Sequence, residues 1–153
     1  MMNLEDQDLE FAKLKLIENG LSLVIVKKGT VIFETKKQGI SGFLQAIETL
    51  KQDLVGASVA DKIVGEAAAL LFVYSRVSSV FALAVSSGGI RVLEDNNIVC
   101  LFEKKVSNIL NRSKTDVCPF EKLAMDSRSP EEAYLKLKYF ASQMMSNSTK
   151  TNC

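Results

Sequence analysis

One stretch in the middle of the chain, residues 56–71, constrains the fold more than any other. After a polar start, only Gly65 and Glu66 interrupt an apolar run that continues beyond the stretch. A helix that is apolar on every side is typical of the centre of a domain. Ser58, with Asp61 three residues later, predicts a variant of the capping box at the start of such a helix. The sequence therefore predicts that this stretch begins the central, buried helix of an α/β domain.

The length and charge of the chain limit the classes of protein to which it can belong. Its 153 residues fit one domain, which we expect over residues 1–145, with a frayed tail over residues 146–153. The 19 Lys and Arg residues nearly balance the 18 Asp and Glu residues, and this net charge of +1 does not favour nucleic acid or a membrane surface as a partner. No apolar run reaches the ~20 residues of a membrane span, and the acidic N-terminus does not resemble a signal peptide. We expect a cytoplasmic protein, whose oligomeric state, a homodimer included, the sequence leaves open.

The number and spacing of the cysteines indicate whether they form disulfides or remain reduced. Cys100, Cys118 and Cys153 are an odd number at irregular spacing. Small secreted domains instead carry an even set of cysteines that forms a disulfide framework. We therefore expect reduced thiols.

The first half of the chain predicts a helix, a β-hairpin and a second helix. Residues 4–17 mix apolar and charged side chains at helical spacing, and the Asn-Gly pair at 19–20 is typical of a helix end. Two β-branched runs on either side of a turn at 27–30 predict the hairpin. Ser41 is an N-cap residue type, and apolar residues follow it at helical spacing as far as Leu54.

The second half, beyond the central helix, predicts two further strands among short helices. Strands are expected over residues 79–85 and 98–102, and helices after the turn at 86–89, over 104–115, from Pro119 and from Pro130. With the hairpin this makes four strands, in a mixed sheet between layers of helices.

Four separated segments carry a resemblance to a known family. They are residues 56–71, Asn111-Arg112, Cys118-Pro119-Phe120-Glu121 and Pro130-Glu131-Glu132-Ala133-Tyr134. Together they resemble a small bacterial family that is classed as a domain of unknown function with a cytidine-deaminase-like fold. The resemblance runs from about Leu9 to Phe140. It implies a three-layer α/β/α sandwich with a mixed sheet and the central helix beneath it.

Zinc deaminases of that fold hold their metal at the starts of two neighbouring helices. They use a His or Cys ligand near a glutamate at the first start, and a Pro-Cys-x-x-Cys pair at the second. This chain contains no histidine; Asp61-Lys62-Ile63 stands at the first place and Ser86-Ser87-Gly88-Gly89 at the second. We therefore expect no metal, no cofactor and no zinc-dependent deamination, because no ligand set remains to activate a water molecule.

The start of the expected central helix is the first candidate site, bordered by Ser58 and Gly65. A helix N-terminus attracts anions, so Lys62 and free N–H groups can meet an anionic group, while Asp61 can meet a hydroxyl or amino group. The alternative is structural. Asp61 then caps the helix, and Lys62 is a solvated charge with at most an i,i+4 contact to Glu66.

Later segments supply the other candidates. Ser86-Ser87 opens a Gly-rich turn that can cradle a phosphate or serve turn geometry alone. Asn111-Arg112 can contact an anion, or Arg112 is only a surface charge. Cys118 precedes a proline at a helix start, where a thiolate is favoured, and Glu121 can cap that short helix. For Cys118 and Glu121 too, structural roles are the alternative.

Two hypotheses about function follow. In the first, the protein is a binding module that keeps a deaminase-like cleft without metal and holds a nucleotide-like or ADP-ribose-like small molecule there. In the second, it is a metal-independent enzyme acting on a nucleotide-derived substrate, with Cys118 as nucleophile or Asp61 as base. The chain offers no histidine for a Cys/His pair. A purely structural role is favoured if side chains fill the cleft.

Overall fold

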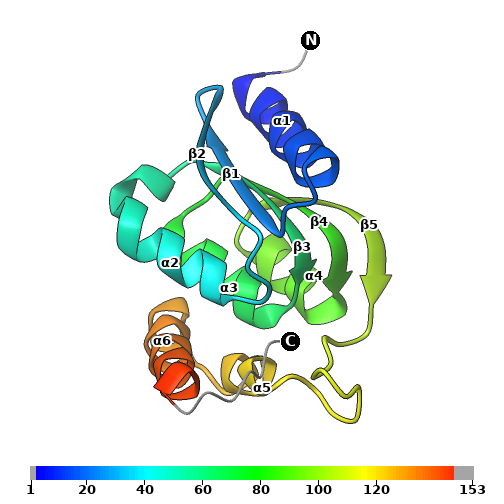
Figure 1. Cartoon of the computed structure of the whole chain (residues 1–153), viewed down its shortest axis with the longest axis vertical. Coiled ribbons are helices and arrows are strands. Elements are labelled where there is room, and N and C mark those ends of the chain that lie inside the picture. Colours follow the sequence, from blue (N-terminus) through cyan, green and yellow to red (C-terminus); the bar gives the residue numbers. More distant parts are fainter. Residues whose placement is uncertain (1–2, 147–153) are drawn as a thin grey trace.

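A mixed sheet forms the middle layer of the computed structural model, which describes residues 3–146, with the backbone alone at 145 and 146. Its strands are β1 (Leu23–Lys27), β2 (Thr30–Thr35), β3 (Ser58–Val64), β4 (Ser79–Ser86) and β5 (Val99–Val106). The five strands lie in the order β2-β1-β3-β4-β5 (Figure 1). β1 is antiparallel to β2 and β3, whereas β3, β4 and β5 are parallel to one another.

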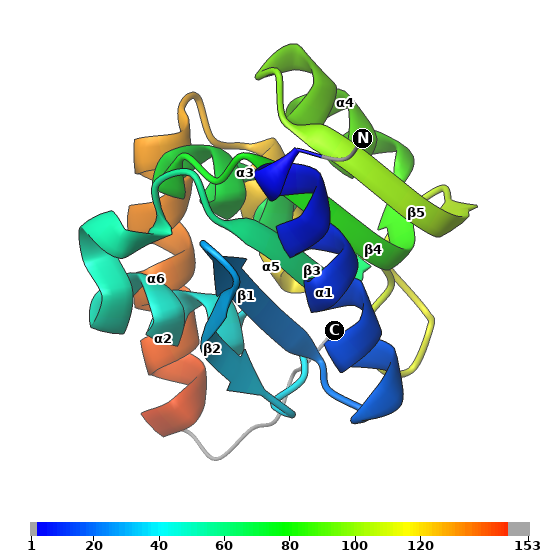
Figure 2. The same cartoon turned by 90° about the horizontal axis from the view of Figure 1, so that it is seen from above.

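Helices cover both faces of the sheet. On one face, α1 (Leu4–Glu18) lies across β1, β3 and β4 (Figure 2). The helices on the other face are α2 (Ser41–Leu50), followed by the 3-10 helix η1 (Lys51–Leu54), α3 (Glu66–Ser75) and α4 (Ser87–Asp95). Beyond them, α5 (Pro119–Met125) and α6 (Pro130–Ser146) pack on α3 (Figure 1). The expected three-layer α/β/α sandwich with a mixed sheet is confirmed, and α5 and α6 add to its second helical layer.

The prediction of one helix over residues 56–71 is wrong in its first half. Residues 58–64 form β3, and the helix begins only at Glu66, with Gly65 as its N-cap residue. β3 is paired on both edges, and α1 and α3 cover its two faces. β3 is buried over Ser58–Ala60, whereas Asp61 and Lys62 are partly exposed and Ile63 is exposed, so it lacks the strict alternation of a half-buried strand. Periodicity alone does not distinguish so short a run from the start of a buried helix. The prediction of a central, buried helix is confirmed for α3, which lies between the sheet and α5 and α6.

Local sequence signals were reliable where a cap or a turn marks an element. Asn19 is the C-cap residue of α1, and prolines open α5 and α6, as expected. Residues 86–89 were expected to be a turn before the next helix, but α4 already begins at Ser87, with Ser86 as its N-cap residue. Ser41, however, is the first residue of α2 and not its N-cap, and its Oγ donates to the backbone of Gln38. The expected helix over 104–115 is absent because β5 continues to Val106 and a loop follows.

The remaining part of the tail prediction, residues 147–153, lies outside the described residues. None of the helices in residues 3–146 combines the length and apolar character needed to cross a membrane.

A buried carboxylate fastens α1 to the hairpin. Asp8 is 8% exposed, and its two oxygens accept hydrogen bonds from the backbone N–H groups of Lys28 and Gly29, each at 2.9 Å. Both donors lie in the turn between β1 and β2. A carboxylate is needed because it can accept from both donors at once.

Replacing this carboxylate should therefore destabilise the fold. We expect Asp8→Ala to lower the free energy of unfolding by about 2 to 4 kcal/mol, because two N–H groups lose their acceptors. Urea denaturation measures the loss, with Glu10→Ala on the exposed side of α1 as the control. Equal effects of the two variants would contradict this role of Asp8.

Candidate functional site

A small hollow lies where β3 ends and α3 begins, with a volume of about 50 Å³. Four segments that are distant in sequence line it: Gly39, Ile40 and Ser41 before α2, Asp61, Ile63, Gly65 and Ala68 around the end of β3, Ile109 in a loop, and Cys118, Phe120 and Glu121 at α5. Most of these side chains are apolar, and two are carboxyl groups. In α/β folds, the carboxyl ends of parallel strands are the usual place for ligands.

Asp61 is a carboxyl group of this hollow whose pKa is shifted strongly by its surroundings. The residue keeps some exposure, but its carboxyl is enclosed, and this burial raises its pKa to about 7. Backbone N–H groups of Ile63 and Lys62 oppose the rise only in part, the contact from Ile63 being long at 3.4 Å. Near neutral pH, Asp61 can therefore either accept or release a proton.

Glu121 is the second carboxyl of the hollow, and it caps α3. Its Oε1 accepts from the N–H of Glu66 at 2.7 Å and its Oε2 from the N–H of Ala67 at 2.8 Å. The residue is 4% exposed, and burial raises its pKa despite these two bonds. The prediction that Glu121 caps its own short helix is wrong, since its partners lie 54 and 55 residues earlier.

Two glycines are required by the close approach of these helix starts. A Cβ on Gly65 would lie 2.0 Å from Oε1 of Glu121, and one on Gly88 would lie 2.2 Å from Oε1 of Glu66. Glu66 thus lies over Gly88, at the start of the neighbouring helix. The Gly-rich turn after β4 therefore has a packing role.

The structure brings together only part of the predicted site. Asp61, Gly65, Cys118 and Glu121 line one hollow. Asp61 and Lys62 lie on β3 and not at a helix N-terminus, and successive strand residues point to opposite faces, so Lys62 points away from the hollow. The suggested i,i+4 contact between Lys62 and Glu66 is not possible, because Lys62 lies in β3 and Glu66 in α3.

Ser58 and the Ser86-Ser87 turn have structural partners. Ser58 does not cap a helix: it is buried in β3, where it donates to the backbone of Glu5 and accepts from the hydroxyl of Ser79. Ser86 caps α4 by accepting from the N–H of Gly89 at 3.0 Å. Ser87 donates a long hydrogen bond to the carbonyl of Val106. None of the three lines the hollow.

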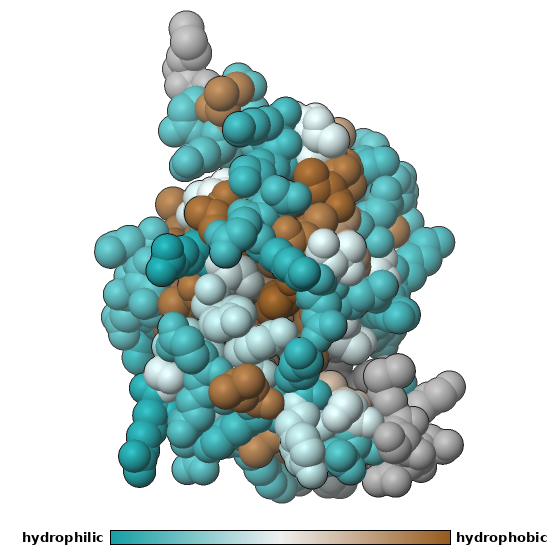
Figure 3. Space-filling model, turned by 90° about the vertical axis from the view of Figure 1, so that its left-hand side faces the viewer, coloured by the Kyte–Doolittle hydropathy of each residue, from teal (hydrophilic) through white to brown (hydrophobic). Residues whose placement is uncertain are grey.

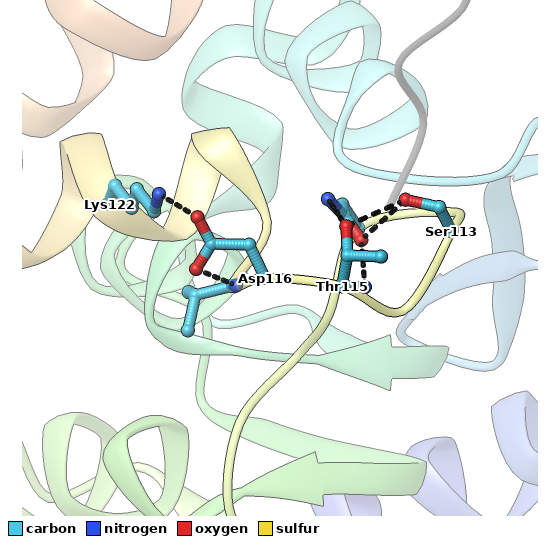
Figure 4. Close-up of polar contacts among 6 residues, drawn as sticks. Ser113, Thr115, Asp116 and Lys122 are labelled. Atoms are coloured by element: carbon cyan, nitrogen blue, oxygen red, sulfur yellow. Dashed lines mark hydrogen bonds and ion pairs between the residues drawn. The ribbon is translucent and has the colours of Figure 1, made fainter.

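Asn111 and Arg112 belong to the loop between β5 and α5, whose residues Ser113, Thr115 and Asp116 appear in Figure 4. The side chain of Asn111 accepts from the N–H of Thr115 and donates to its hydroxyl, and Asp116 pairs with Lys122 of α5. An isolated bridge between Leu110 and Val117 closes the loop. Asn111 therefore shapes the loop, and the exposed Arg112 does not reach the hollow.

The expectation of reduced thiols holds for Cys100 and fails for Cys118. Cys100 is free and half-buried in β5, and burial raises its pKa to about 11. Cys118 is disulfide-bonded. A disulfide sulfur carries no thiolate, so Cys118 offers no nucleophile in this form.

The residues at the two helix starts do not fit a catalytic zinc ion. Because α3 begins at Glu66, the residues directly before the first helix start are Val64 and Gly65, and not the expected Asp61-Lys62-Ile63. Neither Val64 and Gly65 nor Ser86 supplies an imidazole or a thiolate. Within residues 3–146, no group of three or more His, Cys, Asp or Glu side chains is placed to hold a metal ion.

The layers and strand order define the class as an α/β/α sandwich domain. The profile of one protein family, TM1506, a domain of unknown function (DUF1893), matches residues 11–141. The chain belongs to this family, which confirms the resemblance seen in the four segments.

One solved structure agrees with this assignment. A DUF1893 family protein (TM1506) from Thermotoga maritima is similar over 92% of both chains, with 26% identity and a TM-score of 0.79. Two structures of RibD from Acinetobacter baumannii are less similar, each with a TM-score of 0.47 and with 16% and 20% identity. They cover 82% and 80% of this chain, and 39% and 36% of RibD. No curated protein matches the sequence.

Sequence reasoning missed the apolar walls of the hollow. Ile40, Ile109 and Phe120 come from separate segments, and nothing in their local sequence predicts that they meet. Asp61 was selected because we expected it at the start of the central helix, although it lies in β3.

The contact between Gly65 and Glu121 can be tested with a double-mutant cycle. We expect Gly65→Ala to destabilise the protein by about 1 to 3 kcal/mol through overpacking, and Glu121→Ala by about 2 to 4 kcal/mol through two lost hydrogen bonds. The double variant should be destabilised by about 1 kcal/mol or more less than the sum of the two single-variant losses. The reason is that the new methyl group no longer meets a carboxylate. Chemical denaturation measures each value, and Lys122→Ala on the same helix is the control. Additive losses would show that Glu121 is not what excludes a side chain at residue 65.

The raised pKa of Asp61 makes stability depend on pH. The carboxyl ionises near pH 3.9 in the unfolded chain and near pH 7 in the fold, so the folded protein holds an extra proton between these values. Its contribution therefore falls as pH rises from about 4 to 7, by at most about 4 kcal/mol. We expect Asp61→Asn to gain stability relative to the parent protein between pH 4.5 and pH 8, whereas Asp53→Asn on the exposed part of η1 should not. Urea denaturation of the parent protein and both variants at pH 4.5 and pH 8 measures these stability differences.

Proposed function

We propose that the protein binds a nucleotide-like small molecule, through an amino or hydroxyl group that enters the hollow and donates a hydrogen bond to Asp61. The observation that carries this proposal is the enclosed carboxyl of Asp61, whose pKa burial raises to about 7. In residues 3–146, no side chain donates a hydrogen bond to it. A ligand that brings a donor would stabilise the ionised form of this carboxyl.

The charges of the hollow narrow the ligand. Asp61 and Glu121 are both acidic, and Glu121 already accepts two of the N–H groups that α3 would offer to an anion. A phosphate is therefore disfavoured here. The amino group of a cytosine or adenine base, or a ribose hydroxyl, suits an acceptor. The cytidine-deaminase-like resemblance supports the same class, because those enzymes receive a base in a pocket.

The size of the hollow limits how such a ligand can bind. Pockets for whole small molecules measure about 300 to 1,000 Å³, so a hollow of about 50 Å³ admits one functional group. The rest of a nucleotide-like ligand would extend over the mouth, which Gly39 and Ile109 border. The positive φ of Gly39, +78°, shows that this rim uses a backbone conformation favoured by glycine.

Calorimetric titration with adenosine and cytidine tests the proposal. Since the ligand donates to the carboxylate, affinity should rise about tenfold per pH unit from pH 5.5 to 7 and become level above pH 7. Asp61→Asn should weaken binding at pH 8 and abolish this pH dependence. Lys62→Ala is the matched control, because Lys62 is next in the strand and points to the other face. Binding that is absent, or the same in Asp61→Asn at every pH, would refute the proposal.

The alternative is a metal-independent enzyme in which Asp61 is a general base. A carboxyl with a pKa near 7 is suited to moving protons at neutral pH, and this favours Asp61 over the disulfide-bonded Cys118. Chromatography of nucleosides and nucleotides incubated with the protein would reveal a product. Turnover that persists in Asp61→Asn would remove this role.

A further inference from the structure

A second and much larger hollow lies at the other end of α3. Its volume is about 750 Å³, within the range of small-molecule sites. The last turn of α3, the end of α2 with η1, and the first turns of α6 enclose it. Figure 3 faces the side of the molecule that carries α2 and α6, and brown apolar atoms are visible there between teal and pale ones. Because α3 is about 15 Å long at 1.5 Å per residue, this hollow is separate from the one at Asp61.

A buried hydroxyl on the floor of this hollow has no partner. Ser75, the last residue of α3, lines the hollow and is 8% exposed. Its Oγ has no hydrogen-bond partner, and within residues 3–146 it is the one enclosed side-chain oxygen or nitrogen of which this is true. Buried polar groups in proteins are nearly always hydrogen-bonded, and a serine hydroxyl that is unpaired beside a large hollow can turn to meet a partner from outside the chain.

The walls of the hollow are ordered by ring stacking and by an ion pair. Tyr74 of α3 and Tyr134 of α6 stack with their ring centres 4.4 Å apart. Lys138 pairs with Glu48 of α2 at 2.6 Å and also lies over the ring of Tyr134. The charges of Glu48 and Lys138 therefore neutralise each other, and the hollow is held open between three elements.

Two further cations lie at the rim of the hollow. Lys51 and Arg76 both line it, and in the described part of the chain neither has an ion pair within 4 Å or a side-chain hydrogen bond, although Lys51 is near enough to Glu48 to help lower the pKa of that carboxyl. One exposed carboxylate, Glu131, faces them from α6. The unpaired charge of the hollow is thus positive, and it suits an anionic group that two side chains can contact.

The backbone does not require a lysine or an arginine at these two positions. Lys51 has φ +50° and Arg76 has φ +60°, conformations in which glycine is favoured. The backbone carbonyl of Arg76 accepts from the N–H of Gly56, and a glycine at residue 76 would keep that bond. Replacement by glycine therefore removes each cation while leaving the fold intact.

We propose that this hollow is a binding site for an organic anion of about nucleotide size. Lys51 and Arg76 hold its anionic group, Ser75 hydrogen-bonds its polar body, and the paired tyrosines border it. The proposal does not depend on the function proposed for Asp61.

Calorimetric titration of the whole protein with AMP, ribose 5-phosphate and inorganic phosphate tests this site. We expect AMP or ribose 5-phosphate to bind more tightly than phosphate, and the affinity to fall about tenfold or more in Arg76→Gly and in Lys51→Gly. Ser75→Ala should weaken binding as well. All three variants should melt at the same or a higher temperature than the parent protein, since they relieve strain or remove an unpaired hydroxyl.

Two control variants show whether binding takes place in this hollow. Lys28→Gly removes a cation from a position of the same kind, with φ +51°, in the distant hairpin turn, and should leave binding unchanged. In Asp61→Asn, the part of the binding that Arg76→Gly and Lys51→Gly remove should persist, even where binding in the smaller hollow is lost. The proposal is overturned if none of the three probes binds at millimolar concentration, or if binding survives in the Arg76, Lys51 and Ser75 variants. Binding that is lost in Asp61→Asn alone would overturn it too, and would place the ligand in the smaller hollow.

Discussion

The bond between Glu121 and the start of α3 is the interaction on which the rest of this structure depends. A carboxylate that is 4% exposed accepts the N–H groups of the first two residues of α3, at 2.7 and 2.8 Å. It satisfies donors that would otherwise be unpaired at the helix start, and it joins α5 to the sheet end of the domain. Because the carboxylate comes this close, a side chain at residue 65 would collide with it, and glycine is favoured there.

The same helix separates two hollows of opposite chemistry. At its N-terminal end, the hollow is small and contains two carboxyl groups, one of which has a pKa near 7. At its C-terminal end, the hollow is large, and its unpaired charges are mostly positive. A donor group suits the first and an anion suits the second. A nucleotide carries both kinds of group, but the length of α3 keeps the two hollows apart.

Membership of the DUF1893 family places the fold without supplying a function, because one fold supports many activities and only the site decides among them. The site differs from that of the zinc deaminases in the residues that precede its two helix starts. The residues before the two helix starts are Val64, Gly65 and Ser86, which provide packing and a cap instead of metal ligands. The N–H groups of α3, which a helix start offers to an anion, are already occupied by Glu121.

The sequence by itself determined the elements whose ends carry local signals. Asn19, Pro119 and Pro130 act through their own backbone conformation or through a partner a few residues away, so α1, α5 and α6 could be predicted in place.

Only the tertiary structure decided β3, the role of Glu121 and the properties of Asp61. The short, partly apolar run of β3 has no periodicity that separates a strand from the start of a helix, and its pairing with β1 and β4 settles which one forms. Glu121 meets donors more than 50 residues away, and the pKa of Asp61 rises because distant segments exclude water from it. These effects depend on contacts between segments far apart in the chain, which no local pattern records.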